Sequence, residues 1–500
     1  MLGSYEYPEF PLSRDKYGVR PNEHIPAAVL HQYLTDYAKH FGVFDRIQFN
    51  TKLDTVVPDS DDAWILTTSS PKGTETLHTK RLILATGLTS SPNLPSYPGQ
   101  ESFTVPFFHA KDFCAHKGTL STAKNAVVVG GAKSAFDVAS AYKDAGVHVD
   151  VVIRPDGNGP LWMAPPFVTP LKKKLEELLH TRLLTWFSPT PWGGEDGFSF
   201  ARDFLHGTKI GRMLVHTFWY LLSSGVVKDN DYDSPQLVAL KPWHSAFWTG
   251  SGISILNFDT DFFQSVKEGK VTVHIANVSH LRGNEVFLST NDSIMTDVVV
   301  CATGWKKSPT FDFEKPTMMN PSGLDDADMD RLAEEADRKI LTMFPSLKDQ
   351  PILQKKPRKI TPMRLYRFIV PPAFIAKRNI AFAGRVSSVS TSMCAAIQGL
   401  WISTYMDGKL KRLPKTTNEA VDEAFLHSQW GKWRYPCGYG ASIADFAFDA
   451  LPYFDLLLHD LGLKSHRKSG PIAEILEPYK PWDYAGLVSE WTSHGAKALF

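Results

Sequence analysis

The residues of this chain best suited to chemistry form one short turn, Gly130-Gly131-Ala132-Lys133-Ser134-Ala135. Two glycines allow a tight bend and let the backbone approach a pyrophosphate, and the start of a following helix offers unpaired N–H groups and a positive dipole end. A small residue at the last position keeps helix and strand close together. The turn differs from the usual G-x-G-x-x-G/A pattern at Ala132, which stands where the second glycine is expected. It predicts a dinucleotide site with Gly130, Gly131, Lys133, Ser134 and Ala135 as candidate contacts.

The residues around the turn predict the elements that position it. An apolar run at residues 126–129 is typical of a buried parallel strand, and residues 135–142 carry apolar side chains at the spacing of a helix face. Residues 148–153 predict a second strand, which ends at Arg154. A carboxylate there would accept from a ribose hydroxyl, whereas an arginine favours a 2′-phosphate. The unit therefore predicts NADPH rather than NADH; a plain βαβ crossover with a small-residue turn is the alternative.

Composition excludes several classes of protein. Five hundred residues correspond to roughly three domain equivalents, and 54 basic against 53 acidic side chains imply no nucleic-acid partner. The four cysteines are scattered without a C-x-x-C, which argues against a metal site or a disulfide framework. No apolar leader follows Met1, and the longest apolar stretch, residues 213–227, predicts a buried helix. We expect a cytoplasmic protein without membrane contact.

An internal repeat adds a second candidate site. After a predicted helix at residues 26–44, short strands are expected at residues 47–49, 52–57 and 63–68, and residues 81–85 then run into Thr86-Gly87. The same order returns with strands at residues 271–278, 285–289 and 297–301, which run into Thr303-Gly304. Small residues after an apolar strand let the backbone come near a bound dinucleotide. The repeat predicts two nucleotide-binding halves, of which the first lacks an opening glycine turn.

Several further segments carry a resemblance to a known family. Residues 103–113 (FTVPFFHAKDF) match an F-x-G-x-x-x-H-x-x-x-Y/W fingerprint at Phe103, His109 and Phe113, with Val105 replacing the glycine. Residues 379–384 (NIAFAG) and residues 391–406, which include Gln398, are similar to a segment that returns to a flavin domain. With the glycine turn and both Ala-Thr-Gly segments, the sequence resembles the flavin-containing monooxygenase (FMO) family, in the FMO-like branch common in fungi.

The resemblance implies an α/β fold with two interleaved Rossmann-like dinucleotide-binding domains. It divides the chain into residues 1–123 (first part of the FAD domain), 124–306 (NADPH domain with a helical insertion at about 155–270), 307–410 (return to the FAD domain) and 411–500 (C-terminal extension). Insertions of this kind can roof an active site. The extension is expected to be ordered and without chemistry of its own. The resemblance says nothing of the oligomeric state.

The resemblance also implies cofactors and a reaction. In the family, NADPH reduces FAD, and the reduced flavin captures O2 as a C4a-hydroperoxide that oxygenates a substrate. The apolar insertion suggests a small lipophilic substrate, such as a secondary-metabolite intermediate. Gly384 and Gln398 would then bind cofactor with Thr86, Gly87, Thr303 and Gly304, and His109 would help to set the NADP+ or flavin position. Packing of His109 between Phe108 and Phe113 is the alternative for that residue.

The sequence departs from the family at its beginning. The family's own G-x-G-x-x-G and the acidic residue for the FAD ribose have no counterpart, and residues 5–11 resemble a segment that follows that motif. Either the first FAD-binding domain is truncated here at its N-terminus, or the chain is a paralogue that binds FAD weakly. An NADPH-binding pseudoenzyme or sensor without flavin, and a flavin reductase without oxygen insertion, are the alternatives in function. Another G-x-G, Gly250-Ser251-Gly252, is expected to be a loop.

Overall fold

A five-stranded parallel sheet forms the centre of the nucleotide-binding half. The structure, a computed structural model, describes residues 3–20, 23–59, 62–168, 173–257, 261–307, 309–313, 324–354 and 362–497. The strand order is β13-β8-β7-β17-β6, with bounds β13 (Val271–Ile275), β8 (His148–Ile153), β7 (Asn125–Val129), β17 (Val298–Cys301) and β6 (Phe107–His109). The middle strands are largely apolar and buried, as in a sheet covered on both faces, with Asn125, His148 and Asp150 as the exceptions.

One helix crosses from β7 to β8 and confirms the predicted strand–turn–helix–strand unit. It is α4 (Lys133–Asp144), which buries Ala135, Val138, Ala139 and Tyr142. Since β13 and β8 lie on one side of β7 while β17 and β6 lie on the other, the direction of winding reverses between β7 and β17. A parallel sheet binds its ligands at the carboxyl end of such a reversal.

Two antiparallel meanders confirm the internal repeat. The first contains β1 (Lys52–Pro58), β2 (Trp64–Ser70) and β3 (Gly73–Thr79), and the second contains β14 (Val278–Arg282), β15 (Glu285–Leu288) and β16 (Ser293–Met295). Each is followed by a short apolar strand, β4 (Leu82–Leu84) or β17, that runs into Ala-Thr-Gly. Gly87 and Gly304 have φ values of +68° and +81°, so both copies end in the same left-handed turn.

Two expected strands differ from the structure. Residues 47–49 form no strand, because they follow the 3-10 turn η1 (Phe44–Arg46) with Ile47 and Phe49 exposed and no neighbouring strand among the described residues. Residues 271–275 join the parallel sheet as β13, so the second meander begins only at Val278.

Two further strands of the first half form a small parallel pair. β20 (Ile380–Phe382) lies beside β4, and their inner side chains pack with Trp64 and Val56 from the meander. The helix α2 (Ala27–His40) lies nearby, over the N-terminal segment. Ile83, in the middle of β4, is 51% exposed, and no described strand other than β20 pairs with β4.

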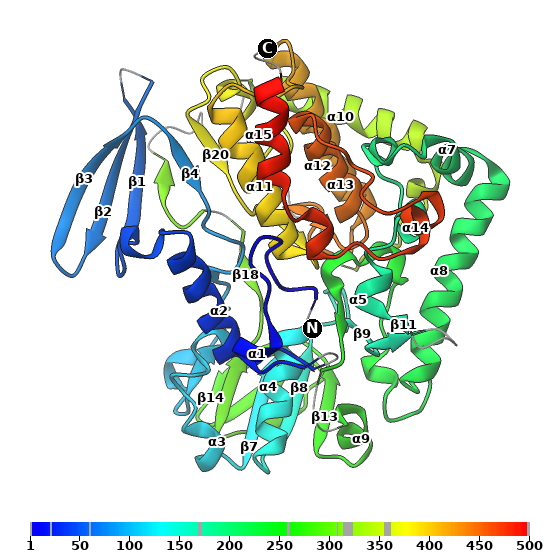
Figure 1. The fold of residues 1–500 in the computed structure, drawn as a ribbon. Coiled ribbons are helices and arrows are strands. Elements are labelled where there is room, and N and C mark those ends of the chain that lie inside the picture. Colours follow the sequence, from blue (N-terminus) through cyan, green and yellow to red (C-terminus); the bar gives the residue numbers. More distant parts are fainter. Residues whose placement is uncertain are drawn as a thin grey trace.

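The chain between β8 and β13 is largely helical and lies along one side of the molecule (Figure 1). Its helices are α5 (Leu175–Leu178), α6 (Arg182–Trp186), α7 (Ser199–Gly207), α8 (Lys209–Asp229) and α9 (Phe262–Lys267). The prediction of a buried helix at residues 213–227 is wrong for the outer face of α8: Val215 and Trp219 point inward, whereas Met213 and Leu221 are more than 60% exposed. Within the described chain, no helix has both the length and the apolar character to cross a bilayer.

The C-terminal residues form helices that pack into the same core. These are α11 (Thr391–Met406), α12 (Thr417–Arg434), α13 (Ala450–Leu461), α14 (Pro471–Leu476) and α15 (Leu487–Lys497). Buried ion pairs join this part to the insertion, since the guanidinium of Arg182 in α6 contacts the carboxylates of Asp455 in α13 and Glu474 in α14. Removing one partner of such a pair costs about 3–5 kcal/mol, so these helices are an integral part of the fold.

Candidate cofactor-binding site

The glycine turn at the end of β7 is shaped by close backbone contacts. Gly130 has φ +150°, and a Cβ there would lie 2.5 Å from the carbonyl oxygen of Ala302 at the end of β17. A Cβ on Gly131 would lie 3.1 Å from a methyl carbon of Ile153 in β8. The two glycines therefore allow the turn to pack between the ends of both neighbouring strands. Ala132 has an extended φ of −106° and an exposed side chain, which explains how alanine is accommodated there.

The same turn presents open donors toward solvent. Ala132 and Ser134 are exposed, and the N–H groups of Gly131, Ala132 and Ser134 make no hydrogen bond to the described part of the chain. They lie at the start of a 12-residue helix, whose dipole adds positive potential. The ammonium of Lys133 pairs with the carboxylate of Asp137 one turn on. The turn thus has the donors and the field that bind a phosphate group, and its surface is accessible.

Arg154 follows β8 directly and lies at the same edge of the sheet. Its side chain is exposed and packs over the backbone of Gly157, where a Cβ would be 3.1 Å from the guanidinium Nε. No carboxylate among the described residues forms an ion pair with it. The end of β8 therefore carries an uncompensated cation, which suits a 2′-phosphate better than a ribose hydroxyl.

His109 ends β6 and holds the second Ala-Thr-Gly turn. Cys301 of β17 pairs with Val129 on one side and with His109 on the other, so these three strands end in line. The imidazole is 3% exposed; its Nδ1 accepts from the Lys111 N–H at 3.1 Å, and its Nε2–H donates to the Gly304 carbonyl oxygen at 2.9 Å. Burial lowers the pKa of His109, so the ring is neutral and both nitrogens are bound by backbone.

A second contact fixes this turn from the opposite side. The N–H of Asn93 donates to the Gly304 carbonyl at 3.0 Å, and the Thr303 hydroxyl donates to the Asn93 carbonyl at 2.6 Å. The imidazole of His109 itself meets Trp305 edge-on at 5.1 Å. The rings expected to enclose it have other partners: Phe108 stacks on His116 and Phe113 lies against Tyr142.

The parallel pair β4–β20 forms a second carboxyl edge, where Thr86, Gly87 and Gly384 lie. The Thr86 carbonyl accepts from Ser90 Oγ at 2.6 Å. The N–H of Gly384 donates to Gln398 Oε1 at 2.9 Å, and Gln398 Nε2 donates to the Tyr453 hydroxyl at 2.8 Å. Gln398 is 1% exposed. It therefore orients Gly384 from inside the protein and does not present its amide at the surface of the edge.

Two cations at this edge escaped the sequence analysis. Arg385 follows Gly384, is 8% exposed and donates from Nη2 to the Lys307 carbonyl at 2.8 Å. Lys307 reaches the carbonyl of Leu88, the residue after Gly87, with Nζ at 3.4 Å. The Nε of Arg385 has no hydrogen-bond partner, and neither cation pairs with a carboxylate within the described ranges. The available signal was a cation just beyond each small-residue turn, at Trp305-Lys306-Lys307 and at Gly384-Arg385.

Electrostatics at these two side chains point to an anionic ligand. Burial lowers the pKa of Arg385, and burial together with the nearby Arg385 guanidinium lowers the pKa of Lys307, against the opposing field of Asp445. Burying a cation without a counter-charge is costly unless a partner compensates it. Lys307 has the ring of Tyr439 at 4.2 Å from its ammonium, whereas an anionic group at the β4–β20 edge would supply a partner for Arg385.

The chain is similar to a family model and to several known proteins. A family model described as pyridine nucleotide-disulphide oxidoreductase matches residues 12–180. An FAD-dependent monooxygenase of Aspergillus nomiae is 33% identical over 537 residues, covering 99% of this chain and 90% of that protein. The chain belongs to the FAD-dependent monooxygenase family. Human flavin-containing monooxygenase 1 is 28% identical over 194 residues, or 36% of this chain and 35% of that protein.

Membership of this monooxygenase family confirms the predicted FMO-like resemblance and makes the protein an oxidoreductase. The fold agrees as well: the structure of cyclohexanone monooxygenase from Rhodococcus sp. Phi1 bound to NADP+ is similar with a TM-score of 0.57 at 14% identity, covering 92% of this chain and 88% of that one. This confirms the predicted Rossmann-like α/β fold. Most predicted site residues lie at one of the two carboxyl edges, while Gln398 and His109 lie behind them.

Proposed function

We propose that this protein is a flavin monooxygenase that uses NADPH, FAD and O2 to oxygenate a small lipophilic substrate. NADPH would lie at the Gly130 turn and FAD at the β4–β20 edge. The observation that carries the proposal is the exposed turn with three unengaged N–H groups and an uncompensated Arg154 beside it. The predicted division into an FAD domain, an NADPH domain with insertion and a C-terminal extension is part of the proposal.

The residues around the turn fit NADPH. The N–H groups of Gly131, Ala132 and Ser134 would bind the diphosphate, because these donors lie at the start of a helix. The guanidinium of Arg154 would bind the 2′-phosphate. Thr303 and Gly304 leave room for the nicotinamide half, since no side chain extends from the left-handed glycine. His109 would act as a positioning residue that keeps Gly304 in place through its carbonyl.

The residues at the β4–β20 edge fit FAD in part. Lys307 and Arg385 offer two cations to an anionic part of the cofactor, and Gly87 and Gly384 keep the edge free of side chains. Within the described residues, this edge lacks a glycine turn between a strand and a helix of the kind found at Gly130. When bound, the flavin supplies electron transfer from NADPH and the reaction with O2; the protein supplies orientation and a site that excludes water.

The insertion supports a lipophilic substrate. Trp243 lies directly against Gly159, where a Cβ would be 2.4 Å from the indole ring, and the Gly159 carbonyl lies beside Gly131. Trp243 is 37% exposed, so it presents an aromatic surface next to the nucleotide turn. An apolar substrate that approaches the cofactors from this side would gain contact area with the ring.

The test is the flavin content and redox response of purified protein. We expect a yellow protein after reconstitution with FAD, whose visible flavin absorbance NADPH bleaches under nitrogen. Oxygen would restore the colour, with one substrate oxygenated per NADPH consumed once the substrate is found. A protein that stays colourless and consumes no NADPH at any FAD concentration contradicts the proposal.

A second candidate is an NADPH-binding protein without flavin. The observation that bears on it is Ile83 in β4, which is 51% exposed, so this face of the β4–β20 pair is open in the described structure. Calorimetry separates the two: tight NADPH binding with no FAD binding indicates the sensor, whereas binding of both cofactors supports the monooxygenase. NADPH consumption that yields only hydrogen peroxide across a broad substrate panel would indicate a flavin reductase.

A further inference from the structure

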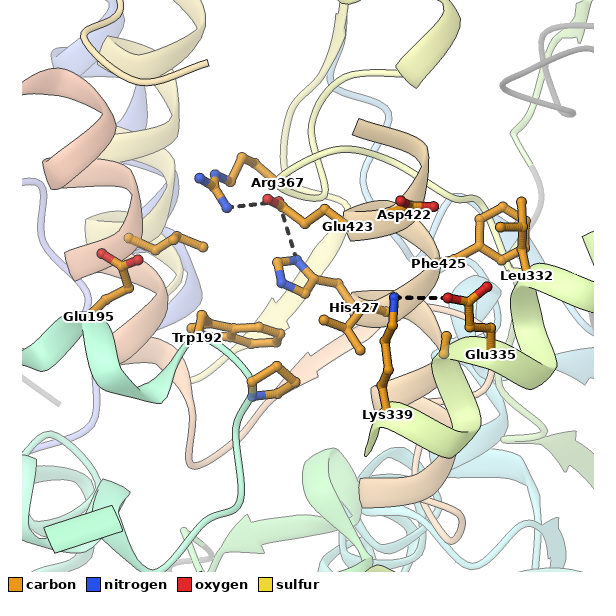
Figure 2. A pocket seen from close by; sticks show the side chains of 14 residues that line it. Trp192, Glu195, Leu332, Glu335, Lys339, Arg367, Asp422, Glu423, Phe425 and His427 are labelled. Carbon is orange, nitrogen blue, oxygen red and sulfur yellow. Dashed lines mark hydrogen bonds and ion pairs between the residues drawn. The ribbon is translucent and has the colours of Figure 1, made fainter. Parts of the chain in front are cut away.

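A separate cavity lies in the half of the molecule opposite the parallel sheet. It has a volume of about 340 Å³ and lies between α10 (Asp326–Met343), α12, the 3-10 turn η4 (Gly193–Asp196) and α13. In Figure 1, α10 and α12 lie at the top, while β7, α4 and β8 lie at the bottom. None of the candidate cofactor-binding residues lines this cavity. Figure 2 shows its charged and aromatic walls.

One wall contains a buried histidine without a hydrogen bond. His427 is 5% exposed, and its Nδ1 forms no hydrogen bond with the described residues. The nearest charged atom is Oε1 of Glu423, one helical turn earlier, at 3.6 Å. Burial holds the pKa of His427 well below its ordinary value, so the ring is neutral. A distance of 3.6 Å is too long for a direct bond and leaves both groups open to a bridging donor.

The carboxylate beside this histidine is only partly compensated. Glu423 accepts from Arg367 Nη1 at 2.8 Å, but the same guanidinium also binds Asp460 with contacts of 2.8 and 3.2 Å. Burial raises the pKa of Glu423 to about 7, Arg367 lowers it and Asp460 raises it further. Asp460 also pairs with Arg412 Nε at 3.0 Å, and Arg412 Nη2 pairs with Glu195 at 3.1 Å, so two guanidinium groups serve three carboxylates and negative charge remains in excess.

The rest of the lining has the same bias. Of the charged side chains that line the cavity, four are acidic and two are basic: Glu195, Glu335, Asp422 and Glu423 against Lys339 and Arg367. Lys339 pairs with Glu335 at 3.2 Å (Figure 2). The apolar lining includes Trp192, Phe425, Leu332 and Leu456. The indole Nε1 of Trp192, which is 4% exposed, also lacks a hydrogen-bond partner within the described chain.

We propose that this cavity binds a small organic cation, a protonated amine with a short hydrocarbon part, whose ammonium group lies between Glu423 and His427. An ammonium group has several N–H donors, so it can donate to the carboxylate Oε1 and to the imidazole Nδ1 at once. The hydrocarbon part would contact Leu332 and Leu456, and the ring of Trp192 favours a cation nearby. An anion would meet the excess carboxylates, and a neutral ligand would leave the negative charge uncompensated.

The proposal does not depend on the proposed redox function, and calorimetry with the full chain tests it. The probe is 2-phenylethylammonium, with 2-phenylethanol as a neutral ligand of similar shape. We expect the amine to bind at least tenfold more tightly than the alcohol. Glu423→Gln should weaken amine binding at least tenfold and leave the alcohol unaffected. Glu334→Gln removes an exposed carboxylate of α10 that does not line the cavity, and it should bind the amine like the wild type.

Glu423 is part of a partly buried ion pair with Arg367, so its replacement can weaken binding by disturbing the fold. A second variant separates that effect from loss of the carboxylate. Leu332 lies half-buried on α10 and lines the cavity, so Leu332→Trp should fill part of the volume and weaken binding at least tenfold while thermal stability is kept. Equal binding of amine and alcohol, no heat of binding at millimolar amine, or unchanged binding in the folded Leu332→Trp protein would each overturn the proposal.

Discussion

The Nε2–H of His109 donates to the carbonyl oxygen of Gly304 at 2.9 Å, across the ends of β6 and β17. Because Nδ1 of the same ring accepts a backbone N–H, the tautomer is set by the protein and the ring has no lone pair left for a ligand. The histidine that the resemblance marked as helping to set the cofactor position therefore holds the Thr303-Gly304 turn.

Replacing His109 should loosen the turn at Thr303-Gly304. His109→Ala removes a buried hydrogen bond and leaves the Gly304 carbonyl with Asn93 alone, at a cost of about 1–3 kcal/mol in the free energy of unfolding. We expect NADP+ affinity, measured by calorimetry, to fall about tenfold, and His109→Gln to restore part of it, because an amide N–H can reach the same carbonyl. Wild-type affinity in His109→Ala would show that the turn does not depend on the imidazole.

Arg154 should decide between the two nicotinamide cofactors. Arg154→Asp exchanges attraction for repulsion at the 2′-phosphate, so the ratio of NADPH to NADH affinity should fall at least tenfold. Calorimetric titration of both cofactors measures the ratio. Arg282→Asp is the matched control, because Arg282 is an exposed arginine in β14, outside the parallel sheet. A ratio that is the same in wild type and Arg154→Asp would mean that Arg154 does not contact the phosphate.

Arg385 should contribute to FAD binding. Arg385→Gln removes a buried cation whose Nε has no partner in the described structure, so FAD affinity should fall at least tenfold. Quenching of flavin fluorescence on binding gives the dissociation constant without any need for turnover. Lys377→Gln removes an exposed cation in the same segment and should bind FAD like the wild type. Stronger FAD binding in Arg385→Gln would contradict an anionic partner at this edge.

The sequence predicted the nucleotide-binding half well, because its signals are local. The apolar run before Gly130 and the helical spacing after it lie within one strand–turn–helix unit. The repeated Ala-Thr-Gly segments at Thr86 and Thr303 indicated two nucleotide-binding halves. The failures concern contacts between distant segments. Only the packing of α8 on its neighbours decides that Trp219 is buried and that Met213 is exposed. The contact between Lys307 and Arg385 likewise joins the residue after β18 (Trp305–Lys306) to a residue that follows β20. No spacing rule connects residues 78 positions apart.

Gly130 at the end of β7 should not tolerate a side chain, whereas Ala132 should tolerate substitution by glycine. Gly130→Ala would place a Cβ 2.5 Å from the Ala302 carbonyl at φ +150°, and overpacking of this kind costs about 1–3 kcal/mol. Ala132→Gly restores the family pattern at an exposed position with negative φ, so stability should change by less than about 1 kcal/mol. Urea denaturation of both variants measures the difference. Equal stability of the two variants would mean that the β7 and β17 ends can separate freely.

A buried histidine in the insertion should make the protein sensitive to mild acid. His206 in α7 is 2% exposed with its Nε2 at 2.9 Å from the Trp186 carbonyl, and burial lowers its pKa to about 3, aided by Arg202 and Arg434. The unfolded chain has the ordinary pKa of about 6.5, so it binds the proton first as the pH falls. The stabilising effect of the neutral ring is therefore complete above about pH 6.5 and is lost progressively between about pH 6.5 and 3.

His206→Gln tests this account, because glutamine keeps an N–H donor for the Trp186 carbonyl and does not titrate. At pH 5.5 the wild type should have lost about 1.4 kcal/mol of unfolding free energy through this residue, relative to pH 7.5, and the variant should lose that much less. Urea denaturation at both pH values gives the difference between the two proteins. His180 and His427 are buried as well and remain in both proteins, so their contribution cancels in the comparison. An identical fall in stability for wild type and His206→Gln would mean that His206 is already accessible to protons in the folded state.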